Sequence, residues 1–391
     1  MSKATDPRHF FQTTNAINIS ERKATKSKNT HGNPIKLRSK ILACASDPHD
    51  GGRVYVAQAG GIIENVALES GEITATYAGP NAPVTCLAVS QTHVFGGCWD
   101  KTIYSWPISS SSVSPIRPDR IFSAGHTDFV KALLYVPLAN KELLISGGAD
   151  AAITVWDAQK GEKLHVLKEH GRGVQALTLD PLSTSAEGVS IFSADSSREI
   201  RRWRLTGASA SEVDVSGNND LSAETECQPL VAHETSVYAL RFDADGDMWT
   251  ASADKTAKCL VRERGWAADT ELVHPDFVRD IAIDEDGGWI VTACRDEEVR
   301  LWERASGKLF HTFSGHFEEV TGLLLVGRTV VTVSIDATIR KWSLKPDDLK
   351  KAREETKAQE LGNAQVEEAI STSMLTEEEE RELAELMDED D

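Results

Sequence analysis

Histidine, hydroxyl and carboxylate side chains recur at similar spacing along this 391-residue chain. In each complete set a histidine is followed 16 to 20 residues later by Ser or Thr, after four more residues by Asp, and after a further six by Trp. Side chains of these types can transfer protons or activate a hydroxyl nucleophile, as in a Ser–His–Asp triad. The complete sets are His126–Ser146–Asp150–Trp156, His274–Thr292–Asp296–Trp302 and His316–Thr332–Asp336–Trp342.

Three incomplete sets follow a similar spacing, with 16 to 23 residues between the first two positions. They are His170–Ser193–Ser197–Trp203, which lacks the Asp; His233–Thr250–Asp254–Leu260, which lacks the Trp; and Pro80–Gly96–Asp100–Trp106, which lacks the His and the hydroxyl.

Other catalytic and metal-binding motifs are absent from the sequence. It contains no GxSxG elbow, Walker loop, HExxH or GxGxxG, and His165 and His170 lack the spacing of metal ligands. The six cysteines lie far apart with no CxxC pair, which predicts reduced thiols rather than disulfides or a zinc site. We therefore expect a protein that is not an enzyme, with no catalytic residues, no metal and no cofactor.

The elements that carry these residues repeat. The residues at the Trp position follow one another at intervals of 40 to 57, which indicates a unit of about 40 residues with insertions. Within a unit, apolar residues alternate with polar ones between Gly, Ser and Asp turns, as in 130–134, 143–150 and 152–157. This pattern predicts short antiparallel strands.

Two stretches resemble the repeat of the WD-repeat family: GHTDFVKALL…SGGADAAITVWD (125–157) and GHFEEVTGLLL…SIDATIRKW (315–342). The resemblance covers roughly 40–344. It implies an all-β fold, a seven-bladed β-propeller of four-stranded antiparallel blades, with six blades as the alternative. The seventh copy is degenerate, at 54–79, with Gly60 in place of the Asp. In this family an N-terminal strand usually closes the ring, and we expect that strand at 15–20.

The resemblance also implies a structural role for the recurring side chains. In WD repeats the His, Ser or Thr, Asp and Trp form a buried hydrogen-bond chain. An ionised Asp can accept from the imidazole, and a buried indole N–H needs an acceptor. We therefore interpret the sets as structural.

The family pattern further implies a partner-binding top face around the central channel. Several residues carried over to that face are aromatic or basic, types that dominate protein interfaces. A mouth of this kind on an acidic protein favours an acidic or phosphorylated peptide. The predicted contact residues are Trp99, Phe129, Lys131, Tyr238, Phe277, Arg279 and Arg295.

Charge divides the chain into three parts. The formal net charge is −19, but 1–40 form a basic arm, with Arg22, Lys23 and Lys26 among its cations. The propeller is expected over 41–344, followed by an acidic, partly helical tail at 345–391. The tail is a solubilising segment, a helix that docks on a partner, or a segment that contacts the basic arm. Its docking face would carry Leu383, Leu386 and Met387.

The predicted function is a non-catalytic scaffold or adaptor subunit of a multiprotein complex. The alternative is a substrate-recognition subunit of a ubiquitin ligase or other modifying enzyme. The expected partners are other proteins. The acidic body argues against nucleic acid, and neither a membrane nor a small-molecule substrate is expected. With no secretory signal, the expected location is the cytoplasm, the nucleus or both.

Overall fold

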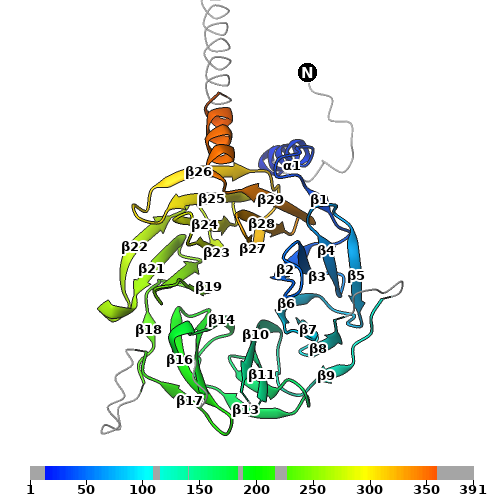
Figure 1. Ribbon diagram of the computed structural model, residues 1–391, viewed down its shortest axis with the longest axis vertical. Helices are drawn as coiled ribbons and strands as arrows, with labels where there is room; N and C mark the ends of the chain where they lie inside the picture. The colour runs from blue at the N-terminus through cyan, green and yellow to red at the C-terminus, as the bar shows by residue number, and fades with distance from the viewer. Residues whose placement is uncertain (1–13, 109–114, 140, 184–187, 216–226, 359–391) are drawn as a thin grey trace, which may run out of the picture. The chain divides into compact units, whose positions relative to one another are not determined.

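The computed structural model describes residues 14–108, 115–139, 141–183, 188–215 and 227–358. The chain forms two compact units, Met1–Trp342 and Ser343–Asp391. In the described part of the first unit, seven antiparallel sheets follow one another around a ring (Figure 1). The seven-bladed expectation is confirmed, and the six-bladed alternative is wrong.

The blades are numbered here in chain order. Blades 1 to 3 are β2 (Ile41–Ser46), β3 (Arg53–Gln58), β4 (Ile62–Ala67) and β5 (Ile73–Ala78); β6 (Val84–Val89), β7 (His93–Cys98), β8 (Ile103–Pro107) and β9 (Arg120–Phe122); and β10 (Val130–Leu138), β11 (Lys141–Gly148), β12 (Ile153–Asp157) and β13 (Lys163–Leu167). Blades 4 and 5 are β14 (Val174–Leu179), β15 (Gly188–Asp195), β16 (Glu199–Thr206), β17 (Ala210–Val213) and β18 (Leu230–Val231); and β19 (Val237–Phe242), β20 (Met248–Ser252), β21 (Thr256–Val261) and β22 (Ala267–Val273). Blades 6 and 7 are β23 (Val278–Asp284), β24 (Trp289–Cys294), β25 (Glu298–Glu303) and β26 (Leu309–Ser314); and β27 (Val320–Val326), β28 (Thr329–Ser334), β29 (Thr338–Ser343) and β1 (Ile35–Lys36).

The hydrophobic core lies between blades rather than within them. One cluster joins Cys86 and Phe95 of blade 2 to Leu144 and Trp156 of blade 3. A sheet buries both faces only when it is stacked against neighbours on each side, so the ring must close for every blade to be covered.

The ring closes in a different place from the one predicted. Residues 15–20 lie in a helix, α1 (Thr14–Lys26), and the closing strand is β1, where Ile35 pairs with Ile339 and Lys36 with Thr338. The prediction of a strand at 15–20 is therefore wrong. The alternating apolar residues of that segment run into a stretch rich in Glu, Lys, Arg and Ala, which are mostly good helix formers.

Blade 1 confirms the degenerate copy at 54–79. Gly61, next to the residue that replaces the turn Asp, has φ +77°, and a Cβ there would lie 2.6 Å from the Pro80 carbonyl oxygen. In place of the His–Asp contact, the Gln58 amide donates to Glu64 at 2.5 Å.

The second unit begins a helix at 346, which is described to 358. Leu383, Leu386 and Met387, the residues of the predicted tail-docking face, lie outside the described residues. No helix in the described part of the chain is both long and apolar enough to span a membrane.

Candidate functional site

The first strand of every blade carries a β-bulge that points one side chain into the central channel. The register shifts at the second strand residue in β2, β6, β10, β14, β19, β23 and β27. A bulge re-aims the side chain that it releases from the ladder. The released residues all line the channel cavity: Leu42, Thr85, Lys131, Gln175, Tyr238, Arg279 and Thr321.

A recurring backbone hydrogen bond joins the two kinds of loop that surround the channel mouth. The residue before the turn Asp donates its N–H to a residue near the start of the first strand, as from Ala149 to Phe129 at 2.8 Å and from Arg295 to Phe277 at 2.8 Å. The same bond joins Trp99 to Pro83 at 3.1 Å. The predicted top-face positions therefore lie on loops that are fixed to one another at one end of the ring.

Blades 2 and 3 contribute an exposed aromatic pair to the mouth. The rings of Trp99 and Phe129 are stacked, with centroids 5.1 Å apart and planes 19° apart. Trp99 is 47% exposed and Phe129 is 37% exposed. Apolar faces left open to water in this way are available for a partner.

Blade 6 contributes two cations that already have neighbours. The Arg279 guanidinium lies 4.3 Å from the Tyr238 ring centroid and forms an ion pair with Glu319 at 2.8 Å. Arg295 lies 4.9 Å from the Phe277 ring centroid. Their cation–π contacts hold both the aromatic and the charged groups in fixed positions.

Lys131 differs from these arginines. It forms none of the ion pairs found among the described residues. Burial, followed by repulsion from Arg279, lowers the pKa of Lys131, and Asp128 partly offsets this. An incoming anion would stabilise the charged form of such a half-buried ammonium more than that of a cation that is already paired.

The channel cavity has a volume of about 570 Å³ and brings together Trp99, Lys131, Tyr238 and Arg279. The cavity also holds a pair that the sequence did not predict, in which Arg241 donates to Asp280 at 3.1 Å. Arg241 lies three residues after Tyr238, and Asp280 lies one residue after Arg279. For Asp280 the sequence signal was a carboxylate at a first-strand position that is Ala, Cys or Gly in the other six blades.

The recurring hydrogen-bond chain is complete in blades 3 and 7. His126 contacts Asp150 at 3.1 Å and Ser146 at 2.7 Å, and the Trp156 indole donates to Ser146 at 2.9 Å. In blade 7 His316 contacts Asp336 at 2.8 Å and Thr332 at 2.7 Å, and Trp342 donates to Thr332 at 3.0 Å.

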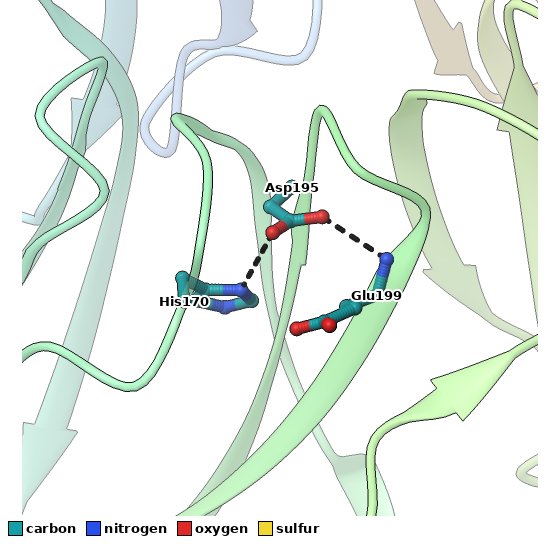
Figure 2. A group of neighbouring side chains, drawn as sticks. All are labelled: His170, Asp195 and Glu199. Atoms are coloured by element: carbon teal, nitrogen blue, oxygen red, sulfur yellow. Dashed lines mark hydrogen bonds and ion pairs between the residues drawn. The ribbon is translucent and has the colours of Figure 1, made fainter.

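In blade 4 a different carboxylate completes the chain. His170 contacts Ser193 at 2.6 Å and Asp195 at 3.3 Å, and Trp203 donates to Ser193 at 2.7 Å (Figure 2 shows the His170–Asp195 contact). The sequence indicated no acid for this set. Asp195, two residues before Ser197, is the last residue of β15 and pairs with Val174 as Gly148 pairs with Val130 in blade 3. A Cβ at Gly148 would point at His126 Nδ1, so an acid at this strand position faces the imidazole.

His170, Asp195 and Glu199 also lie close enough to hold a metal ion. The Asp195 carboxylate, however, already accepts from the Ser197 hydroxyl and from the backbone N–H groups of Ser197 and Glu199, as well as contacting His170 (Figure 2). Its donor set is that of a turn cap, and the group does not fit an open metal site.

In blade 6 the expected chain is broken. His274 contacts Thr292 at 2.8 Å, but its other ring nitrogen faces the Leu272 carbonyl at 3.0 Å. Asp296 instead accepts from Arg300 at 2.5 Å. The interpretation of this set as a complete chain is therefore wrong.

Blade 5 keeps its histidine contacts without the Trp. His233 contacts Asp254 and Thr250 at 2.8 and 2.7 Å. Leu260 and Trp266 fill the apolar space.

The hydroxyl of each chain is buried and engaged. Ser146, Ser193, Thr292 and Thr332 are 0% exposed, and each lies between an imidazole and an indole. A substrate cannot reach such an oxygen, so these groups can stabilise the blades but cannot act as nucleophiles.

Comparisons with known proteins agree with this geometry. Residues 71–107, 225–259, 270–303 and 307–343 match the WD domain, G-beta repeat family, and 120–238 match the family described as the tRNA methyltransferase TRM82 WD40 domain. An uncharacterized WD repeat-containing protein of Schizosaccharomyces pombe is 34% identical over 356 residues, covering 87% of this chain and 89% of that protein.

Other relatives match over less than half of their own length. The nuclear distribution protein nudF of Aspergillus niger is 28% identical over 49% of this chain and 39% of its own length. Human striatin-3 is 26% identical over 62% of this chain and 30% of its own length. The crystal structure of the computationally designed Ika8 protein superposes with a TM-score of 0.59 at 21% identity, covering 79% of this chain and 97% of that one. This last likeness is one of fold alone.

Proposed function

The chain belongs to the WD-repeat family, and from this we propose that it is a non-catalytic scaffold or adaptor that binds a partner protein at the mouth of its channel. Propellers of this family are typically protein-interaction scaffolds. The observation that carries the proposal is the exposed Trp99–Phe129 pair beside Lys131, in a mouth whose other cations are already engaged.

The favoured partner is an acidic or phosphorylated peptide. Its apolar part would cover the aromatic pair, and its anion would pair with Lys131. Charge-assisted contacts in a partly desolvated mouth are stronger than those on an open surface. Arg279 and Arg295, held by Tyr238 and Phe277, would line the path of the peptide.

The experiment is affinity purification with mass spectrometry on the full chain and a Phe129→Ala/Phe277→Ala/Arg279→Ala variant. A matched control, Ile121→Ala/Val273→Ala/Arg264→Ala, removes the same classes of side chain from exposed sites elsewhere on the propeller. We expect a dominant partner that is lost from the first variant and kept by the control. An unchanged partner list for the first variant would overturn the proposal.

A second candidate function is a non-catalytic subunit of a modifying enzyme. The match of 120–238 to the TRM82 WD40 domain favours this candidate, because that family is named for a tRNA methyltransferase. The same purification separates the two functions. A single stoichiometric catalytic subunit, with activity that depends on this chain, would favour the second, whereas several non-enzymatic partners would favour the first.

We also propose that Leu383, Leu386 and Met387 of the tail form a second docking element. The protein would work in the cytoplasm or nucleus. Truncation after Leu344 tests the tail, since a partner lost only on truncation would be bound there.

A further inference from the structure

The N-terminal helix α1 binds the propeller through charged side chains. Arg22 contacts Glu297 at 3.0 Å, Lys23 contacts Glu318 at 2.8 Å, and Lys26 contacts both Glu297 and Glu298, at 3.0 and 2.6 Å. The three glutamates are called here the acidic patch: Glu297 lies in the turn before β25, Glu298 is the first residue of β25, and Glu318 lies in the loop before β27. Figure 1 shows where α1, β25 and β27 lie in the ring. The patch therefore joins blades 6 and 7 at the end of the ring that carries the channel mouth.

Glu297 occupies a turn position that recurs in all seven blades. The equivalent residues all have positive φ: Gly61, Lys101, Ala151, Arg198, Lys255, Glu297 and Ala337. Only blade 6 places an acid there. A left-handed conformation is unfavourable for Glu, so this carboxylate is held in a fixed direction at a cost in backbone energy.

The contact between α1 and the patch is polar. Among the side chains described on the helix, 20–26, none is buried, and Arg22 is 64% exposed. The Glu297 side chain is 6% exposed, and one oxygen of Glu298 is buried without a hydrogen bond. The glutamates belong to blades 6 and 7, and the helix is attached to them by ion pairs that salt screens and that a competing cation can replace.

We propose that the acidic patch is an interaction surface for a basic helical segment of a partner protein, and that α1 occupies it in the free protein. Three features support this: the patch already receives a basic helix, the Ser314 hydroxyl of the propeller also donates to Glu298 at 3.0 Å, and the other oxygen of Glu298 can accept one more donor. This surface is distinct from the channel mouth, which selects an anion, so one propeller end offers two sites of opposite charge.

The test uses the full chain and a fluorescent peptide with the sequence of residues 14–31. In the Arg22→Gln/Lys23→Gln/Lys26→Gln protein the patch is freed, and we expect it to bind the peptide at least tenfold more tightly than the wild type, whose own helix competes. Adding Glu297→Gln and Glu298→Gln to that protein should abolish binding. A peptide with Gln at the same three positions is the matched control.

Two results would overturn the proposal. One is equal affinity of the wild-type and neutralised proteins for the basic peptide. The other is no binding to the neutralised protein at peptide concentrations of roughly 1 mM, the range of effective concentration supplied by a short tether. Hydrogen exchange of α1 in the wild type gives an independent measure: exchange should accelerate as salt rises, and exchange that ignores salt would also contradict the proposal.

Discussion

Blades 6 and 7 carry the same four residue types at nearly the same spacing, yet only blade 7 forms the complete hydrogen-bond chain. His316 contacts Asp336 at 2.8 Å, whereas His274 faces a backbone carbonyl and Asp296 binds Arg300. The residue four positions after the turn Asp is arginine in both blades. The difference arises from what else binds that arginine.

In blade 7 the N-terminal segment binds the arginine, so that it does not pair with the turn Asp. Arg340 donates to the Asn29 side chain at 2.7 Å and to the His31 carbonyl, which leaves Asp336 to His316. Among the described residues Arg300 has no contact with the N-terminal segment, and it donates to Asp296 instead. The comparison teaches that whether the four motif residues form their hydrogen-bond chain depends on a fifth residue, the arginine. The contacts of that arginine depend in turn on a segment about 300 residues away in sequence.

Removing the turn carboxylate should give the largest difference in stability loss between the two blades. We expect Asp336→Ala to lower the free energy of unfolding by about 3 kcal/mol, because it strips a buried imidazole and two backbone N–H groups of their acceptor. Asp296→Ala should cost only about 1 kcal/mol, since it removes a pair nearer the surface. Urea unfolding of both variants measures the difference, and equal losses would show that the broken chain in blade 6 is not a real distinction.

The histidines of the two blades should also affect how stability depends on pH. Burial, followed by repulsion from Arg300, lowers the pKa of His274 to about 4. Between pH 6.5 and 4 the unfolded chain therefore holds more protons at this residue than the folded protein, so stability falls as pH falls through this window, by up to about 3 kcal/mol.

Replacing His274 with Gln should remove that part of the pH dependence. His316→Gln should act in the same direction, because burial lowers the pKa of His316, an effect that the facing Asp336 partly offsets. Unfolding measured at a series of pH values from 7 to 4 gives, for each variant, the slope of the free energy of unfolding against pH. A slope unchanged by His274→Gln would contradict the lowered pKa.

The smallest expected change in stability comes from removing the competing arginine. In Arg300→Met, Asp296 is free to turn to His274, which should raise the pKa of that histidine towards its ordinary value while changing stability by less than about 1 kcal/mol. Titration of the imidazole signals by NMR measures the pKa, with Arg340→Met as the matched control. A His274 pKa that stays low in Arg300→Met would show that burial alone sets it.

Sequence patterns predicted the ring itself because it depends on strongly periodic features. Seven strand-turn units, including the degenerate one with Gly60, could be counted from alternation and turn residues. The closing strand could not be located, since β1 has only two residues and no periodicity to detect. The alternation at 15–20 belongs to a helix instead.

The side-chain networks were less predictable because they depend on competition between groups distant in sequence. Spacing identified His274 and Asp296 as partners but could not show that Arg300 would intervene. It also missed Asp195, which lies in a strand at a position occupied by Gly148 in blade 3. The top-face residues were placed by their offset from a histidine or a turn Asp, and those offsets did not include Arg241 and Asp280, which also line the channel. Whether the top face binds a partner stays a prediction.

The closure of the ring by β1 has a consequence for synthesis of the protein on the ribosome. Ile35 pairs with Ile339, so β1 must wait for a partner strand that is made about 300 residues later. At about 5–20 residues per second, that wait lasts about 15 to 60 s. During this time the nascent blades stack in order while the N-terminal segment has no sheet to join. This β-strand pairing thus joins segments made about 300 residues apart, and the growing chain needs protection from aggregation until the pairing forms.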